Sequence, residues 1–322
     1  MKNSPAKQHF VPKVYLKNFA CNQNGEIYRL KIKSIDGFNK IRTTNISSIC
    51  YKIDFYTIET TDLLTRRNLN DNYVLEKKGF EYENEGFKKK LDKAVKGNSF
   101  TTSEAYDFLS YLINIKDRNP RTRELISQKW LKEDLNNRLN NAESLLAFNS
   151  VGCTYAYDES KEFLVWLRVE ALKFIEDEKN FSDIHRDALL DSYLGREDKH
   201  KINTIKKLLR HQFIVYKTTS DYPFVMSDNP IFAMKFPNQI EHIEYDSFDF
   251  LGFPLNSESM LVLRRDKVDA YDLIFKPIIC VNAEKEFVDK VNEAAIINCI
   301  EYIFSNRKDM LERLKNKFSH IP

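Results

Sequence analysis

The segment KQHFVPKVYLKNFACNQNGEIYRLKIK, residues 7–33, contains the change of pattern that decides the fold class. Pro12 precedes an apolar stripe over residues 15–19, which predicts a short helix that begins near this proline. After the turn signal Asn24-Gly25, residues 26–33 alternate in polarity as a half-buried strand does. The chain therefore begins with a short helix that leads into β structure, and residues 51–58 predict a second strand.

Between about residues 70 and 210 the pattern becomes that of long amphipathic helices. The Thr102-Ser103-Glu104 segment predicts a helix start. Residues 160–179 place apolar side chains at helical spacing, among them Phe163, Trp166 and Val169. We interpret this stripe as part of the core.

Strand patterns return after residue 211. Residues 213–216 and 223–226 predict a hairpin, and the apolar segments 250–255 and 260–263 predict two more strands. A last helix is expected from about 285 to 304, because its apolar residues recur at helical spacing.

This order of elements predicts an α+β fold. The helix-rich middle segment would accompany a mixed or antiparallel sheet built from the N- and C-terminal thirds. No linker, repeat or low-complexity tract interrupts the chain, so we expect a single domain over residues 1–322. Its parts are a β-rich N-terminal part, a helical part, and hairpins with a C-terminal helix, which cover residues 8–60, 70–210 and 211–322.

The composition narrows the class of protein. Hydrophobic residues make up 42% of the 322 residues and the formal net charge is only +3, so the chain can bury a large core and gives no global electrostatic case for nucleic acid. No apolar run reaches the roughly 18 residues that a bilayer span needs, and no signal peptide begins the chain. We therefore expect a cytoplasmic protein without a membrane partner.

The sequence identifies no cofactor. The five cysteines are scattered without a CxxC pair, and the histidines show no HxxxH or HExxH spacing, so we expect no metal site. Phosphate-binding glycine motifs of the GxxxxGK[ST] and GxGxxG types are also missing.

Three polar positions are candidates for chemistry. His9 precedes the predicted helix start, where free backbone N–H groups favour a neutral imidazole. Asp228 follows a predicted strand in Ser227-Asp228-Asn229-Pro230, and strand ends often display catalytic carboxylates. Arg118 and Arg121 lie at a helix break and could bind phosphate. Each also has a structural reading: a capping or core histidine, an Asx turn, and a solvated helix end.

These segments, in this order, resemble a mostly bacterial family known as domain of unknown function 4238. The resemblance begins with Gln8-His9 and the Pro12-x-x-Tyr15-Leu16-x-x-Phe19 run. It continues through Arg118-Asn119-Pro120, where threonine is common in place of Asn119, and through Ser227-Asp228-Asn229-Pro230. It ends with Phe253-Pro254-Leu255, Asn292 and Phe304-Ser305. The resemblance implies that the first and last thirds belong together, and it implies no established reaction.

The leading hypothesis is a hydrolase of a phosphate-containing substrate, a nuclease acting on RNA or DNA in a bacterial toxin or anti-phage role. His9 would be the general acid or base, Asp228 would orient it or hold a divalent ion, and Arg118 would stabilise phosphoryl charge. The substrate-binding residues would be Gln8, Tyr15, Asn229, Arg121 and Asn292.

One alternative is a non-catalytic binding or regulatory module, in which His9 and Asp228 form a buried structural hydrogen bond that joins the N-terminal helix to the C-terminal sheet, and the partner is a protein or a second copy. Another is a nucleotide- or ADP-ribose-processing enzyme. An open, positively biased cleft lined by His9, Arg118 and Asp228 would favour catalysis, whereas buried, mutually satisfied side chains would favour the structural reading.

Overall fold

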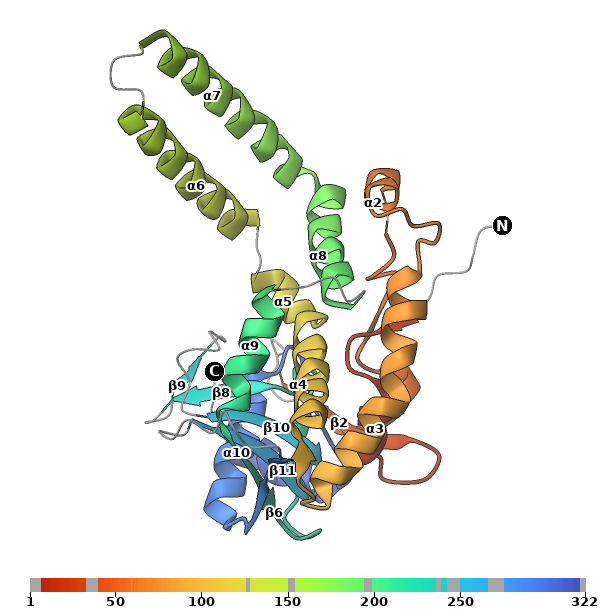
Figure 1. Ribbon diagram of the computed structural model, residues 1–322. Helices are drawn as coiled ribbons and strands as arrows, with labels where there is room; N and C mark the ends of the chain where they lie inside the picture. The colour runs from red at the N-terminus through yellow and green to blue at the C-terminus, as the bar shows by residue number, and fades with distance from the viewer. Residues whose placement is uncertain are drawn as a thin grey trace.

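The computed structural model describes residues 7–32, 40–58, 60–125, 128–149, 154–193, 199–235, 239–241, 250–265 and 275–318. The fold is α+β, as the sequence predicts. Figure 1 shows a body in which helices lie over strands, and a pair of long helices, α6 and α7, that projects from it.

The helices include three short 3₁₀ or π segments. Their bounds are α1 Lys13–Leu16, η1 Lys17–Phe19, η2 Ile46–Ser48, α2 Thr61–Arg66, η3 Leu75–Phe80, α3 Glu81–Val95, α4 Thr102–Asp117, α5 Pro120–Leu125, α6 Gln128–Asn149, α7 Thr154–Glu176, α8 Glu178–Tyr193, α9 Lys199–Leu209, α10 Lys285–Asn298 and α11 Lys308–Phe318. The α4 start is a capping box made by Thr101 and Glu104, one residue earlier than the sequence pattern indicates.

The largest sheet has six strands in the order β13-β6-β11-β10-β8-β9. Neighbouring strands are antiparallel except for β13 and β6, which run parallel. The strand bounds are β6 Gln212–Lys217, β8 Phe232–Lys235, β9 Gln239–Glu241, β10 Phe250–Asn256, β11 Ser259–Arg264 and β13 Ile278–Asn282.

Both faces of this sheet are covered, and β11 shows how. Leu261 points into the core cluster that contains Phe108 of α4, whereas Val262 belongs to the cluster that contains Val291 of α10. Because successive side chains of a strand point to opposite faces, a strand covered on both sides is apolar throughout. This explains the uninterrupted Met-Leu-Val-Leu run of β11.

A second sheet joins the two ends of the chain. Its order is β3-β2-β14-β7, where β2 is Glu26–Lys31, β3 is Arg42–Asn45, β7 is Met226–Ser227 and β14 is Tyr302–Ser305. The strand β14 is antiparallel to both β2 and β7. The first and last thirds of the chain therefore share a sheet, as the family resemblance implies.

Two small antiparallel pairs complete the β structure. They join β1 (Lys7–His9) to β4 (Tyr51–Ile53), and β5 (Phe100–Thr101) to β12 (Phe275–Lys276). The first pair places His9 opposite Tyr51 and so fixes the position of the N-terminal segment.

Two predictions for the C-terminal third are wrong. Residues 213–216 and 223–226 do not form a hairpin, because β6 pairs with β11 and β13, and Met226 in β7 pairs with β14. The last predicted helix ends at Asn298, and residues 302–305 form a strand instead. In both cases an apolar segment pairs with a strand that is distant in the sequence. Local periodicity cannot indicate such a pairing.

The prediction of a core stripe over residues 160–179 is also wrong at its centre. Phe163, Trp166 and Val169 are exposed, although Ile175 is buried. They lie on α7, which leaves the body with α6 along one side and forms a two-helix arm with it (Figure 1). A two-helix arm can bury only the faces along its own seam.

Candidate functional site

Segments that are far apart in the sequence meet in one buried polar cluster. The polar cluster consists of Gln8, His9, Lys116, Arg118, Asn119, Asp228, Asn229 and Asn298. The Nε of Arg118 donates to the Phe10 carbonyl at 3.1 Å, and the Nδ2 of Asn119 donates to the Asp228 carbonyl at 2.8 Å. The end of α4 therefore lies between the N-terminal strand and the segment that follows β7.

His9 belongs to strand β1 and is 8% exposed. Its ring lies tilted against Tyr51, with 5.6 Å between the ring centroids. The Nε2 atom is buried and has no hydrogen-bond partner. The imidazole is thus positioned from one side by the β1–β4 pair, and one of its nitrogens is not satisfied within the protein.

The environment of His9 favours the neutral ring. Burial, followed by the positive charges nearby, lowers the pKa of His9 to about 4, although a hydrogen bond with the Ile46 backbone raises it. The basic residues that lower it are Lys13, Arg118 and Lys7. The unpartnered nitrogen therefore lies in a region of positive potential.

Gln8 has no exposed surface and uses both ends of its amide within the protein. Its Oε1 accepts from the backbone N–H of Tyr56, and its Nε2 donates to the Thr57 hydroxyl at 3.0 Å. The side chain therefore holds the turn at residues 54–57 against the N-terminal strand, and neither end of its amide faces a cavity.

Arg118 is the C-cap residue of α4 and is 2% exposed. Besides the Nε bond to the Phe10 carbonyl, its own carbonyl accepts a hydrogen bond from the Tyr56 hydroxyl. Arg118 thus links the helix end to two other segments, and its charge lies inside the body.

Asp228 is 4% exposed, and backbone N–H groups occupy both of its carboxylate oxygens. Oδ1 accepts from Ile300 at 2.7 Å, and Oδ2 accepts from Glu301 at 2.8 Å and from Tyr302 at 3.0 Å. Burial raises the pKa of Asp228 to about 6, while these N–H groups act to lower it. The hydrogen bond between His9 and Asp228 that the structural alternative predicts is wrong, because among the described residues Asp228 bonds the backbone of residues 300–302 and the Nε2 of His9 has no partner. The carboxylate instead fixes the segment that leads into β14.

Asn229 is equally enclosed. Its Oδ1 accepts from Lys116 at 3.3 Å, and its Nδ2 donates to the Asn298 carbonyl at 3.0 Å. In return, the Nδ2 of Asn298 donates to the Asn229 carbonyl at 2.7 Å. These reciprocal bonds attach the C-terminal end of α10 to the segment after β7.

The other predicted substrate-binding residues lie outside the polar cluster. The Tyr15 hydroxyl donates to the Pro254 carbonyl at 2.7 Å, and its ring stacks on Phe253 with 4.8 Å between centroids. Asn292 bonds the backbone of Pro223 and Val225 from α10, and so holds this extended segment as a neighbouring strand would.

Arg121 differs from the buried residues because it is half-exposed and pairs with Glu124 one helical turn away, at 3.3 Å.

Lys116, Asn119 and Asn298 belong to the polar cluster but are not among the predicted site residues. Burial lowers the pKa of Lys116 to about 8. Lys116 and Asn119 lie within two residues of Arg118, in the helix-break segment that the sequence marks as a candidate site. Their position next to Arg118 could therefore have indicated that they belong to the polar cluster. Asn298 follows an apolar helix pattern, and no local signal marks it.

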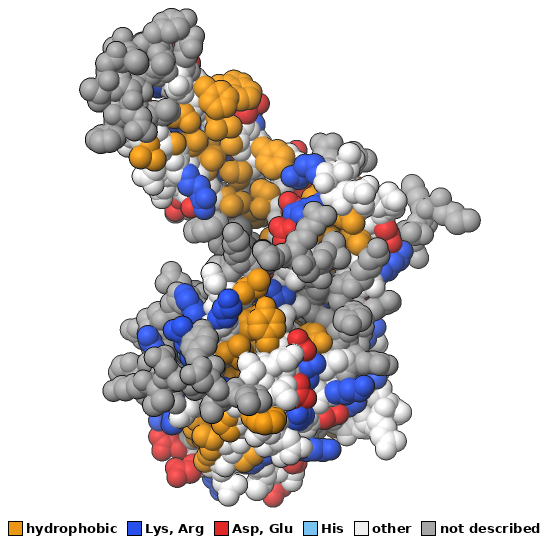
Figure 2. All heavy atoms as spheres, in the orientation of Figure 1, with side chains coloured by type: hydrophobic (Ala, Val, Ile, Leu, Met, Phe, Trp, Pro, Cys, Tyr) orange, Lys and Arg blue, Asp and Glu red, His pale blue; other side chains and the backbone are white. Residues whose placement is uncertain are grey.

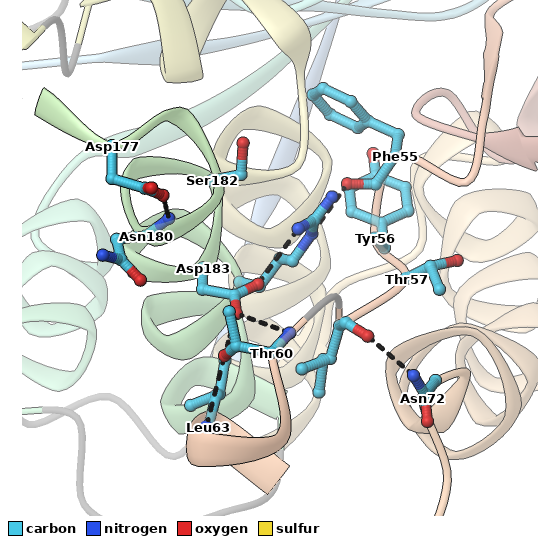
Figure 3. A network of polar contacts seen from close by, with 12 residues as sticks. Phe55, Tyr56, Thr57, Thr60, Leu63, Asn72, Asp177, Asn180, Ser182 and Asp183 are labelled. Carbon is cyan, nitrogen blue, oxygen red and sulfur yellow. Dashed lines mark hydrogen bonds and ion pairs between the residues drawn. The ribbon is translucent and has the colours of Figure 1, made fainter.

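A second polar network adjoins the polar cluster through residues 55–57. Figure 3 shows Asp183 of α8 pointing toward Thr60, whose backbone N–H donates to it at 3.1 Å. The other carboxylate oxygen of Asp183 accepts from Arg186 at 3.0 Å, and the Nε of Arg186 donates to the Phe55 carbonyl at 3.3 Å. This network attaches α8 to the loop that also contacts Gln8 and Arg118.

His185 lies on α8 beside this network. Its Nε2 donates to the Asp117 carbonyl at 3.0 Å, while its Nδ1 is buried without a partner. Burial, against the bond to Asp117, lowers the pKa of His185 to about 4. It is therefore a second neutral histidine inside the body.

Comparison with known proteins adds one finding. A family model described as "Protein of unknown function (DUF4238)" matches residues 7–309. The chain belongs to this family. The match confirms the family resemblance, and its range includes the N-terminal, Arg118, Asp228 and Asn292 segments, whose hydrogen bonds connect the ends of the chain. No curated protein and no solved structure matches the chain.

The described residues place limits on the chemistry of the site. Among them, no three His, Cys, Asp or Glu side chains are grouped as the ligands of a metal ion would be. The same ranges contain no helix with the length and apolar character of a membrane span. The polar cluster combines a neutral imidazole, a buried guanidinium and a buried lysine, which is a set of groups suited to contact an anion, around a carboxylate that backbone groups occupy.

Proposed function

We propose that the chain is a non-catalytic binding or regulatory module in which the polar cluster is structural. One observation carries this proposal: both oxygens of Asp228 accept backbone N–H groups of residues 300–302. A carboxylate that orients a catalytic histidine or holds a divalent ion needs a free lone pair directed at that group. Three of the four lone-pair sites of Asp228 accept backbone N–H groups, and no hydrogen bond joins the carboxylate to a histidine among the described residues.

The burial of the polar cluster supports the same proposal. Gln8 has no exposed surface, and Arg118 and Asp228 expose only a few per cent of theirs. A general acid or base has to come within hydrogen-bond reach of a substrate atom. Buried polar groups that satisfy one another, as Gln8, Asp228 and Asn229 do with their neighbours, are instead typical of a network that specifies one arrangement of the chain. The Nε2 of His9 is an exception within the polar cluster.

The binding surface in this proposal is the α6–α7 arm. It projects from the body and exposes large apolar side chains, including Phe163 and Trp166. Aromatic side chains exposed together on a rigid element are typical of contact surfaces between proteins.

A second candidate function is a phosphodiester hydrolase, and one specific observation favours it. The Nε2 of His9 is buried without a partner, and three basic side chains lie near the ring. A neutral imidazole in that setting would accept a proton from an attacking hydroxyl, and Arg118 would stabilise the developing phosphoryl charge. The toxin or anti-phage role belongs to this candidate.

A cleavage assay separates the two candidates. The full chain is incubated with labelled RNA, single-stranded DNA, duplex DNA, nucleotides and ADP-ribose, with Mg²⁺, Mn²⁺ or EDTA. The binding module predicts no turnover above that of a His9→Gln preparation. The matched control is His211→Gln, which changes a buried histidine that bonds the Lys207 carbonyl on α9.

Cleavage by the wild type and by His211→Gln, lost in a His9→Gln variant that melts at the wild-type temperature, would overturn the binding module and establish the hydrolase. The same three chains, expressed in bacteria, test the toxin role. Growth inhibition by the wild type that disappears with His9→Gln is the outcome that the hydrolase predicts.

A further inference from the structure

The α6–α7 arm is an antiparallel pair joined by polar contacts along its seam. Lys132 bonds Glu176 at 2.7 Å near the body, and Arg168 donates to Asn140 at 2.7 Å. Further out, Lys161 lies 3.7 Å from Glu143. These contacts fix the rotation of α7 against α6, so the outward face of α7 is defined.

That outward face is predominantly apolar. It is here called the arm face, and its apolar residues are Phe163, Val165, Trp166, Val169 and Phe174 of α7, with the exposed Leu145 of α6. The charged residues Glu162, Glu170 and Lys173 lie on the same side of α7 as Trp166, four residues before it and four and seven residues after it. Phe163 and Trp166 are each 57% exposed, and their ring centroids lie 5.7 Å apart. Figure 2 shows hydrophobic side chains gathered on the arm. From Phe163 to Phe174 the face extends about 16 Å along the helix, at about 1.5 Å per residue.

The arm face is large for a surface that stays in water. With roughly 150–250 Å² for a fully exposed aromatic side chain, the exposed fractions leave on the order of 600 Å² of apolar surface. This reaches the upper end of the roughly 300–600 Å² of the largest patch on a typical monomer. It is also about three-quarters of the roughly 800 Å² that one partner contributes to a standard interface.

Charge on the arm selects the class of partner. Residues 128–176 contain six basic and eight acidic side chains, a net charge of 6 − 8 = −2, so the arm has no excess of positive charge for nucleic acid or an anionic membrane. On α7, Glu170 and Lys173 pair with each other at 2.8 Å. Glu162 of the same face is exposed and has no ion-pair partner among the described residues, so the arm face keeps one uncompensated negative charge.

We infer that the arm face binds the arm face of a second copy of this chain, with a two-fold axis between the arms. A two-fold contact places the same patch on both sides, so the patch has to be complementary to itself. A predominantly apolar face whose Glu170 and Lys173 pair with each other meets this requirement when Glu162 stays at the rim of the contact, and two such arms together form a four-helix bundle. The inference rests on the proposed function in taking the arm as the contact surface.

Sedimentation equilibrium of the full chain tests the inference. Samples from about 1 to 100 μM bracket the affinities at the weak end for an interface of this size. The wild type is expected to approach twice 38.0 kDa. Trp166→Glu and Phe163→Glu are each expected to weaken dimerisation by about 30-fold or more, as loss of a hot-spot aromatic does. Because both side chains are exposed in one copy, each variant is expected to keep the wild-type circular dichroism and melting of the monomer.

The matched control is Asn137→Glu, which adds the same charge at an exposed position of α6 outside the arm face. It is expected to dimerise as the wild type does. A wild type that stays at 38.0 kDa at every concentration would overturn the second copy as the occupant. A dimer that neither arm-face variant weakens would overturn the location. Both outcomes are independent of the cleavage assay, which alone decides between the binding module and the hydrolase.

Discussion

Replacing Asp228 removes the acceptor of three backbone N–H groups at once. In Asp228→Ala the amides of Ile300, Glu301 and Tyr302 lose partners at 2.7–3.0 Å. Hydrogen bonds to a charged group contribute roughly 1.5–3 kcal/mol each, and the low end applies here because these three residues are half-buried or exposed and water replaces part of the bond. The gross loss is then about 4–5 kcal/mol.

Part of that loss in stability is offset, because the alanine variant no longer has to bury an ionised carboxylate away from water. Burial raises the pKa of Asp228 to about 6. The rise from the ordinary value of 3.8 corresponds to a cost of about 3 kcal/mol, and subtracting it leaves a net loss of about 1.5 kcal/mol in the free energy of unfolding. For 322 residues, with an unfolding entropy of about 2.1 cal/mol/K per residue, this lowers the melting temperature by about 2 °C.

Asp228→Asn sharpens the prediction. Asparagine keeps one acceptor oxygen but turns an NH₂ group toward N–H donors, so we expect it to destabilise the protein about as much as alanine does. Urea titration gives the free energy, and hydrogen exchange should show faster exchange at residues 300–302 than at the rest of the body. Asp221→Ala is the control, because its carboxylate is 88% exposed and pairs with Arg307, and it should cost under about 1 kcal/mol.

The reasoning would be refuted by an alanine variant that loses less than about 1 kcal/mol with unchanged exchange at these amides. An asparagine variant of wild-type stability would refute it as well, because fixing this segment depends on two acceptor oxygens.

Two further predictions concern other buried groups. The folded-state pKa of His185, about 4, lies below its ordinary value of 6.5, so its contribution to stability is present above pH 6.5 and is lost as the pH falls toward 4. Between pH 7 and pH 5 the wild type should lose about 2 kcal/mol more than His185→Gln, measured by urea titration, and equal losses would contradict the assignment. Asp228 titrates in the opposite direction, because its raised pKa adds stability as the pH falls through 6, and it contributes equally to both chains. Tyr15→Phe should cost about 1 kcal/mol, since it loses the bond to the Pro254 carbonyl and keeps the stack on Phe253, whereas Tyr15→Ala should cost about 3–5 kcal/mol. Equal melting temperatures for the two Tyr15 variants would show that the ring contributes nothing beyond its hydroxyl.

Several features of the fold were readable from local sequence. The pattern after Asn24-Gly25 predicted the strand β2, but its buried residues Ile27 and Leu30 lie on opposite faces in two different core clusters, so the expected half-buried alternation is wrong. Pro12 predicted the start of α1, which follows it directly. The order of patterns predicted the α+β class. These features depend on neighbours within a few residues, where backbone geometry alone decides.

The polar segments of the candidate site could also be identified from the sequence, but whether their role is catalytic or structural could not. The sequence singled out His9, Arg118 and Asp228 and left a catalytic and a structural reading open. The deciding partners of Asp228 lie more than 70 residues further along the chain, at positions 300–302. Backbone N–H groups have no sequence signature, so a carboxylate that binds them cannot be told from one that faces a cleft.

The sequence by itself determined which residues are apolar, which polar segments are candidates for a site, and where helix and strand patterns of the N-terminal third begin. Only the tertiary structure decided which apolar side chains are covered by other elements and which groups bond the polar side chains. Phe163, Trp166 and Val169 have the spacing of a core stripe, yet they lie on the open side of the α6–α7 arm. Periodicity indicates that a helix has an apolar face. The same periodicity results whether that face packs against the helix's own chain or against another molecule. Burial of the face depends on the arrangement of elements that are distant in the sequence, and the helix alone does not determine it.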